Sequence, residues 1–258
     1  MRCLRATVSP ALPMRWAAMS EAAPDAGPLV VAVGDVHGQD AMLARLHAKI
    51  AEATRAQADR RRVLVHVGDY VDRGSDSAGV IRRVRTGLDG FETINLRGNH
   101  EQMMLDAVMT RAPDRVEHWL LNGGREALAS FGCAGHPMAA IDDLAQRAAD
   151  VIDWLAALPY MHREGRYLFV HAGIVPGRAL PEQKMKDLLW IRDQFLDSDA
   201  DHGAIVVHGH TPTDDGAPEL RANRIGIDTG AAKDGPLTAV ILDGAAPPQV
   251  LQVYPHEV

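Results

Sequence analysis

Cysteine is almost absent from this sequence: only Cys3 and Cys133 occur among 258 residues, and both lie outside the glycine-rich motifs described below. Two distant cysteines provide no disulfide framework, so the sequence fits a reducing compartment, and we expect a cytoplasmic protein. The same scarcity leaves a thiol nucleophile without support.

Long apolar runs and a surplus of positive charge are also missing. No segment approaches the roughly 20 apolar residues of a membrane helix, so we expect no membrane association. The formal charge of −7 argues against a nucleic-acid-binding surface. The hydrophobic content of 47% suffices for one substantial core, and we favour a single domain. No feature of the sequence indicates an oligomeric state.

The first 28 residues differ in composition from the rest. They contain several arginines and four prolines, but no apolar stretch long enough for the core of a signal peptide. We interpret residues 1–28 as a disordered leader that precedes one domain over residues 29–258. Two alternatives are an organellar transit peptide and an over-extended start, with Met14 or Met19 as the true first residue.

Five short motifs follow runs of β-branched residues, and glycines flank nearly all of them. They are Gly34–Gly38 (GDVHG), Gly68–Gly74 (GDYVDRG), Gly98–Glu101 (GNHE), His171–Gly173 (HAG) and His208–His210 (HGH). Their polar residues are oxygen and imidazole donors, which suit Mn, Fe and Zn, with no thiolate among them. Glycine lets backbone and bulky anionic ligands come close.

The first three motifs fall into a repeated unit of strand, motif and helix. Residues 29–33 form a continuous apolar run typical of a strand buried on both faces, and apolar residues at helical spacing follow from Gln39. The unit recurs at residues 63–67 and 91–96. This repetition predicts βαβ crossovers with neighbouring parallel strands, and ligands bind beyond the carboxyl ends of such strands.

The rest of the chain divides into a helical and a strand-rich part. We interpret the helical residues 101–158 as an insertion that caps the site, with a bundle packed at the sheet edge as the alternative. Pro181 is expected to open a helix that contains Trp190. Strands are predicted at residues 167–170, 204–207, 224–228, 237–242 and 250–254, the last three joined as antiparallel hairpins. A second sheet packed on the first would give an α/β β-sandwich with helices outside.

The donors at the strand ends form the candidate metal site. A single Asp-x-His pair such as Asp35 and His37 is more often a helix cap and a surface histidine than a metal site. Six donors after successive strands are hard to explain as separate accidents, which favours metal binding. The candidate ligands are Asp35, His37, Asp69, Asn99, His171 and His210.

Taken in order, the first three motifs resemble those of the phosphoprotein phosphatase (PPP) family within the calcineurin-like metallophosphoesterases. His171–Gly173 and Gly209–Pro212 are more similar to the bacterial and bacteriophage lambda branch, as are Asn122–Gly124 and Leu189–Arg192. The resemblance covers roughly residues 29–243. It implies a β-sandwich with a βαβ core and a second mixed sheet, flanked by helices.

The resemblance also implies a dinuclear metal centre. Asp35, His37 and Asp69 would hold one divalent ion, and Asp69, Asn99, His171 and His210 the other. Mn²⁺ is the metal we expect, with Fe and Zn²⁺ as alternatives. A hydroxide shared by the two ions would attack phosphorus in one step, without a phosphoenzyme.

Four further residues have roles implied by the resemblance. His100 would be the general acid that protonates the leaving alkoxide, oriented by Asp72. Arg73 would bind phosphate oxygens, and Arg192 would be a second phosphate-binding arginine. The alternative for Arg192 is a solvated arginine on a helix.

Other polar residues near the motifs have simpler interpretations. Arg97 and Glu101 suit an ion pair or a carboxylate at a helix start better than substrate contact. His66 lies in an apolar strand and reads as a core histidine. His208 competes with His210 for the metal, and the resemblance favours His210. Asp228 reads as a turn residue or as a support for the ligands.

These observations lead to a metal-dependent phosphomonoesterase that acts on phosphoserine and phosphothreonine in proteins. A symmetrical diadenosine tetraphosphate hydrolase or a small-molecule phosphoesterase is the alternative, so the expected partner is a phosphoprotein or a phosphorylated small molecule. A third hypothesis is a catalytically silent regulatory module. Such a module usually lacks a ligand or the acid, and none is missing here.

Overall fold

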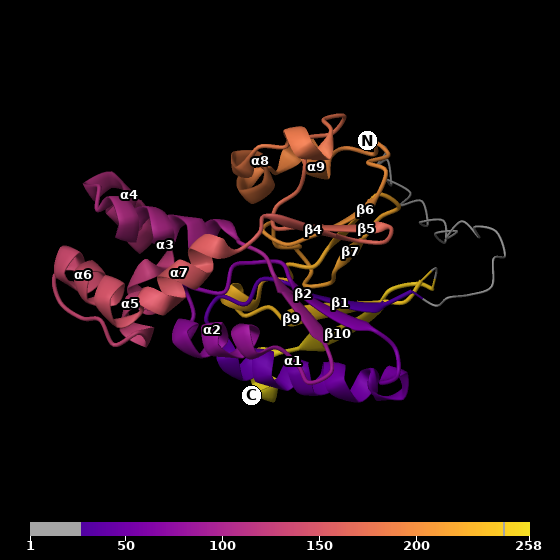
Figure 1. Ribbon diagram of the computed structural model, residues 1–258, viewed down its shortest axis with the longest axis horizontal. Coiled ribbons are helices and arrows are strands. Elements are labelled where there is room, and N and C mark those ends of the chain that lie inside the picture. The colour runs from indigo at the N-terminus through magenta and orange to yellow at the C-terminus, as the bar shows by residue number, and fades with distance from the viewer. Residues whose placement is uncertain (1–26, 245) are drawn as a thin grey trace, which may run out of the picture.

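Two five-stranded sheets lie face to face at the centre of the structure (Figure 1), a computed structural model that describes residues 27–244 and 246–258. The predicted leader lies outside these residues up to position 26. Apolar side chains from both sheets fill the space between them, among them Val65 of one sheet and Phe169 and Val207 of the other. The predicted sandwich is therefore confirmed.

Sheet A carries the repeated unit that the sequence predicted. Its central strands run parallel, whereas the two C-terminal strands are antiparallel additions. In spatial order the strands are β10 (Gln249–Val253), β9 (Leu237–Leu242), β1 (Leu29–Val33), β2 (Arg62–His66) and β3 (Glu92–Asn95). Its outer face is covered by α1 (Asp40–Ala53) and α2 (Ser77–Thr86). Helix α2 begins at Ser77, because the Asp76 side chain accepts from Gly79 N at 2.7 Å.

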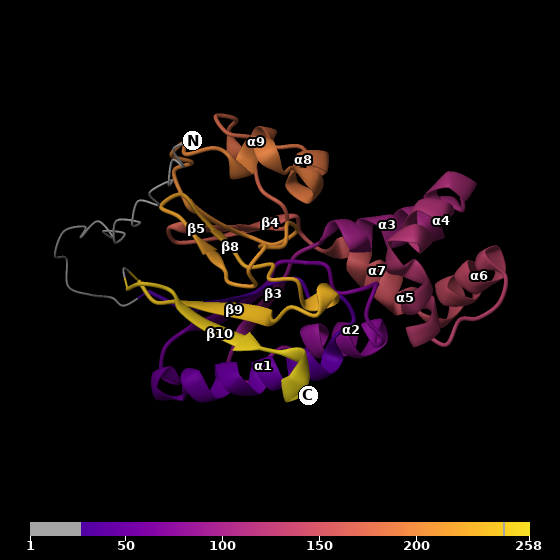
Figure 2. The same cartoon turned by 180° about the vertical axis from the view of Figure 1, so that it is seen from behind.

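Sheet B is mixed and contains two strands that the sequence did not reveal. Its order is β4 (Met161–Glu164), β5 (Tyr167–Val170), β6 (Ile205–His208), β8 (Arg224–Gly226) and β7 (Glu219–Leu220). Both unpredicted strands, β4 and β7, lie at the edges, where a half-polar or two-residue strand needs no apolar pattern. On its outer face lie α8 (Met185–Trp190) and α9 (Asp193–Leu196). Figure 2 shows α8 and α9 on sheet B from behind.

Two predictions about connections are wrong. Strands β8 and β9 do not form a hairpin, because the chain passes from sheet B to sheet A through a turn at Gly230 in the left-handed conformation. Only β9 and β10 pair as predicted. The helix expected from Pro181 is broken, because Gln183 is extended and its side chain binds Val175 N and O at 2.9 and 3.0 Å.

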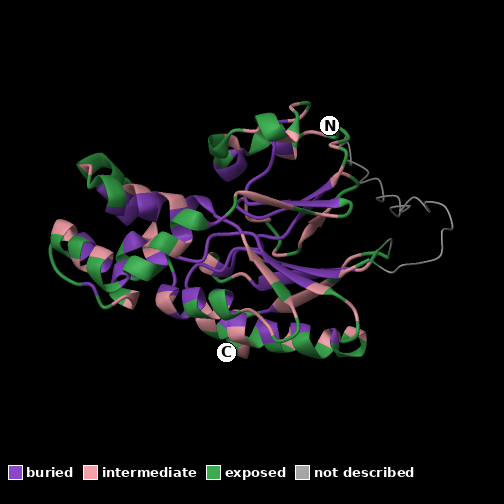
Figure 3. Cartoon of the chain, viewed as in Figure 1, coloured by how far each residue is buried: buried purple, intermediate pink, exposed green. Residues whose placement is uncertain are grey.

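Five helices form a bundle beside the sandwich (Figures 1 and 2). They are α3 (Asn99–Thr110), α4 (Pro113–Trp119), α5 (Arg125–Ser130), α6 (Pro137–Arg147) and α7 (Ala149–Ala157). Between α4 and α5 the chain makes a kinked turn over Leu120–Gly124, where Gly123 has a non-helical backbone with φ at 104°. Figure 3 shows buried residues on the faces that the helices turn inward. Within the described ranges, no helix combines the length and the apolar character needed to cross a membrane.

Three polar side chains form a chain of hydrogen bonds between sheet A and α1. Asn95 Nδ2 donates to Val84 O at 3.0 Å, which turns Asn95 Oδ1 toward His66 Nδ1 at 2.8 Å. His66 Nδ1 therefore donates, and His66 Nε2 is left to accept from His47 Nε2 at 3.1 Å. A second proton on His66 would face the His47 donor. Burial, the largest cause, lowers the pKa of His66 to about 3 and that of His47 to about 4.

This chain of hydrogen bonds predicts a loss of stability in acid. Unfolded histidine has a pKa of about 6.5, so between that pH and about 4 the unfolded chain binds protons that the folded chain does not. The stabilisation is complete above about pH 6.5 and is lost as the pH falls. The His47→Gln protein keeps a donor to His66 but has no titratable group at this position. As the pH falls, its free energy of unfolding should therefore decrease less steeply than that of the wild type, by up to about 1.4 kcal/mol per pH unit. Urea unfolding at several pH values measures this, and parallel curves for the two proteins would contradict it.

Candidate active site

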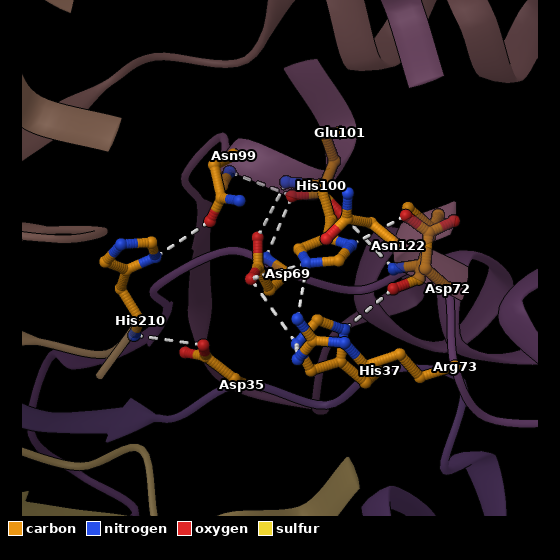
Figure 4. A network of polar contacts seen from close by, with 12 residues as sticks. Asp35, His37, Asp69, Asp72, Arg73, Asn99, His100, Glu101, Asn122 and His210 are labelled. Carbon is orange, nitrogen blue, oxygen red and sulfur yellow. Dashed lines mark hydrogen bonds and ion pairs between the residues drawn. The ribbon is translucent and has the colours of Figure 1, made fainter. Parts of the chain in front are cut away.

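The candidate ligands lie at the carboxyl ends of strands from both sheets. From sheet A, Asp35 and Asp69 follow β1 and β2, and Asn99 opens α3 after β3. From sheet B, His171 follows β5 and His210 follows β6. Figure 4 shows Asp35, Asp69, Asn99 and His210 turned toward one another, with His37 beside Asp69. The end of the sandwich thus collects donors that are far apart in the sequence.

Asp69 belongs to both of the donor sets that the structure brings together. In one set, ligand atoms of His37, Asp69 and His100 all lie within 4.8 Å of one another, and in the other those of Asp69, His171 and His210 do. Asp69 Oδ2 is 3.4 Å from His37 Nε2, and Oδ1 is 3.4 Å from His171 Nε2. Each carboxylate oxygen therefore faces a different set.

The remaining two candidate ligands border these sets. Asn99 Oδ1 lies 2.8 Å from His171 Nε2 and 2.9 Å from His210 Nδ1, inside the second group of donors. Asp35 Oδ2 accepts from His210 N at 3.0 Å. Asp35 Oδ1 is buried and has no hydrogen-bond partner among the described residues. Burying a carboxylate oxygen without a partner costs free energy, so the position of this atom favours a bound cation.

Electrostatics at the site favour cation binding. Burial and the neighbouring carboxylates Asp228 and Asp69 raise the pKa of Asp35, because negative charges are crowded there. Burial lowers the pKa of His37 to about 3 and that of His210 to about 2. Both imidazoles are therefore neutral at pH 7 and keep a lone pair for a metal. The pKa of Asp69 is held below its ordinary value by His171 and two other histidines, although burial opposes this.

Glycines leave room around the carboxylates. A Cβ added at Gly209 would overlap Asp35 Oδ1, and one at Gly98 would overlap Asp69 Oδ1. Together with the unpartnered Asp35 oxygen and the neutral imidazoles, this shape fits two divalent ions held by oxygen and nitrogen donors.

The backbone of the site is strained. Five non-glycine residues adopt left-handed conformations there: φ is 46° at His37, 55° at Asp69, 73° at Asp72, 67° at Arg73 and 68° at His210. Each such residue costs about 1–3 kcal/mol and persists only when its surroundings hold it. Strain concentrated at the ligands is typical of a functional site.

Glu101 holds one of these strained loops. Its carboxylate accepts from four backbone N–H groups: Gly98 at 2.8 Å, Asp69 at 2.8 Å, Tyr70 at 2.7 Å and Val71 at 3.2 Å. The sequence interpretation of a carboxylate at a helix start agrees with this geometry. Burial and the nearby Asp69 carboxylate raise the pKa of Glu101 to about 7, against the effect of the amides.

Replacing Glu101 with glutamine should lower the free energy of unfolding by about 2 kcal/mol, because hydrogen bonds to a charged acceptor contribute about 1.5–3 kcal/mol. The amide NH₂ of glutamine would also face backbone donors. Urea unfolding above about pH 8, where the carboxylate is charged, measures the loss. The control is Glu126→Gln at an exposed position of α5, and equal stability of the two variants would contradict the role of Glu101.

The predicted acid and its carboxylate are paired. His100 Nδ1 donates to Asp72 Oδ2 at 2.7 Å, and both side chains are buried. Arg73 lies across the mouth of the site, with Nη1 2.8 Å from His37 Nε2 and Nη2 2.9 Å from His100 Nε2. Asp69 and Asp72 raise the pKa of His100 although burial opposes them. Sequence reasoning missed Trp119, which donates to Asp72; nothing in its helical pattern distinguished it from a core residue.

The structure also places Arg192 and His208. Arg192 is exposed, and its Nη1 lies 3.4 Å from Thr211 Oγ1, next to His210. His208 lies outside both donor sets, because its Nδ1 donates to Gly209 O at 3.1 Å and its ring packs against Phe195. Of the two histidines in this motif, only His210 faces the other ligands.

Arg97 and Asp228 have supporting positions. Arg97 Nη1 donates to Gln102 Oε1 at 2.9 Å and to the Tyr160 hydroxyl at 2.8 Å, which ties α3 to the chain after α7. Asp228 accepts from Gly230 N at 3.0 Å, and burial first, then Asp69, raise its pKa to about 6. Neither residue belongs to the donor sets.

A sandwich with acidic and imidazole donors at its open end defines a class of metal-dependent phosphoester hydrolases. Residues 28–234 match the family model described as calcineurin-like phosphoesterase, and the chain belongs to this family. It is a metal-dependent phosphatase, and the predicted resemblance to the PPP enzymes is confirmed.

The relatives differ in how much of their length matches this chain. It is 35% identical over 220 residues to serine/threonine-protein phosphatase 1 of Salmonella typhimurium, covering 80% of this chain and 88% of that protein. It is 33% identical to a symmetrical bis(5'-nucleosyl)-tetraphosphatase of Aromatoleum aromaticum, over 43% of this chain and 33% of that protein. The solved structure of a candidate diadenosine tetraphosphatase shares the fold, with a TM-score of 0.59, 21% identity, and coverage of 89% and 99%.

Proposed function

We propose that the protein is a serine/threonine protein phosphatase of the cytoplasm that uses two Mn²⁺ ions. The observation that carries this is the pair of donor sets that share Asp69, with the paired His100 and Asp72 alongside. The relative named serine/threonine-protein phosphatase 1 supports the substrate class, because it matches along most of both chains.

Each group at the site has a defined task in this proposal. Asp35, His37, Asp69, Asn99, His171 and His210 hold the ions, which when bound supply an activated water and positive charge for phosphoryl transfer. Arg73 and Arg192 bind phosphoryl oxygens. Since His100 Nδ1 donates to Asp72, its Nε2 is the atom that gives a proton to the leaving serine or threonine oxygen.

A groove beside the site supports a protein substrate. It has a volume of about 590 Å³ and lies between α8 and the helices α3 and α4, with Met103, His118 and Trp190 in its walls. The Trp190 ring, which lines the groove, lies 6.0 Å from the ring of His210, so this wall of the groove also borders the candidate ligands. We propose that residues 101–158 cap the site by forming one wall of this groove, which would receive the chain around the phosphorylated residue.

The second candidate is symmetrical hydrolysis of diadenosine tetraphosphate. It is favoured by the relative of that name, although the match spans less than half of this chain. The comparison experiment measures kcat/KM of the Mn²⁺-loaded protein on a phosphoserine peptide, an aryl phosphate and diadenosine tetraphosphate. We expect the peptide to be preferred over the dinucleotide; faster turnover of the dinucleotide would overturn the protein phosphatase proposal.

A further inference from the structure

The indole of Trp119 is fully buried and is aimed at the carboxylate that orients the proposed acid. Trp119 Nε1 lies 2.9 Å from Asp72 Oδ1 and 3.1 Å from Oδ2. The opposite partner of Asp72 is His100 Nδ1, at 2.7 Å from Oδ2. Among the described residues, the Asp72 carboxylate has no third hydrogen-bond partner, so Trp119 and His100 together fix its plane.

The turn that follows Trp119 is shaped to hold the indole in this place. A Cβ at Gly124 would lie 2.6 Å from Trp119 Cε2, so only glycine lets the ring settle against the backbone. Gly123, with φ at 104°, accepts from Arg73 N at 3.2 Å. The end of α4 and the turn after it therefore contact both strained residues: the Trp119 indole contacts Asp72, and the Gly123 backbone contacts Arg73.

A packing role alone does not account for the indole. A phenyl ring would fill most of the same volume, but it has no N–H group to donate to a buried carboxylate. Without that donor, Asp72 Oδ1 would be left unpaired, and the carboxylate would be free to rotate away from His100. A rotated carboxylate would no longer hold the imidazole with Nε2 toward the leaving group.

We propose that Trp119 is a positioning residue for His100, acting through Asp72, so that the helical bundle takes part in catalysis as well as in binding. This inference rests on the proposed role of His100 as the acid. Its effect should depend on the leaving group, because an alkyl oxygen needs a proton as it departs whereas an aryl oxygen needs it far less.

The test compares Trp119→Phe with the wild type on a phosphoserine peptide and on an aryl phosphate. Loss of a hydrogen bond to a charged acceptor predicts a fall in kcat of about tenfold to a hundredfold on the peptide. We expect a fall of less than about threefold on the aryl phosphate and an unchanged KM on both. Trp154→Phe, at a half-buried tryptophan of α7, is the matched control and should alter neither rate.

The double variant Trp119→Phe/His100→Asn separates positioning from packing. If Trp119 acts through the acid, the double variant should be no slower on the peptide than His100→Asn alone. Equal losses on both substrates, or additive losses in the double variant, would overturn the inference. If His100→Asn itself affects both substrates equally, the acid assignment fails first and this inference with it.

A second variant covers the case in which Trp119→Phe does not fold, as judged by its melting temperature. Gly124→Ala keeps the indole but places a methyl group in overlap with it, so the ring must shift from the position in which it donates to Asp72. The same preference for loss on the peptide is expected, and equal loss on both substrates would again overturn the inference.

Discussion

Replacing Asp69 with asparagine is expected to lower kcat by about a thousandfold and to reduce the bound Mn²⁺ below two ions per chain. The two oxygens of Asp69 face different donor sets, so one substitution weakens both. Asparagine has the same shape, but it lacks the negative charge and turns an NH₂ group toward one set. Metal ions contribute several kcal/mol to such reactions, and each 1.36 kcal/mol corresponds to a factor of ten.

Two measurements check this expectation independently of activity. Elemental analysis after dialysis gives the metal content, and the shift of melting temperature on adding Mn²⁺ reports binding to the folded state. Asp153→Asn, on the exposed face of α7, makes the same change in charge and should leave both unchanged. An Asp69→Asn protein that retains two ions and the full thermal shift would show that Asp69 is not a shared ligand.

His100→Asn should lower kcat on a phosphoserine peptide by about 10²–10⁴, the range of general acid catalysis. The loss on an aryl phosphate should be at least about tenfold smaller, since its leaving group departs without help. Asn removes the imidazole but keeps a polar side chain next to Asp72. The paired His100 Nδ1 and Asp72 Oδ2, 2.7 Å apart, predict that Asp72→Asn follows the same pattern more weakly.

Steady-state kinetics on both substrates, with metal content measured in parallel, test the acid assignment. His136→Asn, at an exposed histidine before α6, is the control and should behave as the wild type. If His100→Asn loses bound metal as well as rate, His100 acts as a ligand, in keeping with its place in the first donor set. An equal loss on peptide and aryl phosphate at full metal content would exclude the acid role.

The sandwich could be predicted because its central strands carry strong local signals. The apolar runs of β1 and β2 end at glycine-containing motifs, as does the more polar β3, and parallel neighbours bring Asp35, Asp69 and Asn99 to one edge. The sequence pattern was weak at the short edge strands and at the connection between β8 and β9. No local pattern shows that a chain segment changes sheets, because the apolar residues on both sides face the same core.

The roles of single side chains were less predictable than their presence near the site. The contact of Trp119 with Asp72 joins residues 47 positions apart, and helical periodicity marks Trp119 only as buried. The family resemblance favoured His210 over His208, but the local pattern did not separate them, because the direction of each side chain depends on the end of β6 and on the left-handed backbone of His210. Such distinctions arise from packing between elements rather than from local sequence.

The distribution of the proposed ligands over both sheets has a consequence for how the protein would acquire its metal. Synthesis proceeds from the N-terminus, so Asp35, His37 and Asp69 leave the ribosome long before His171 and His210. The second donor set does not exist until β6 has emerged and sheet B has packed against sheet A. With the proposed ligands, a nascent chain would offer only part of the centre, and the second ion would enter after translation of residue 210. The supply of metal would then matter for the second ion only once most of the chain has been made.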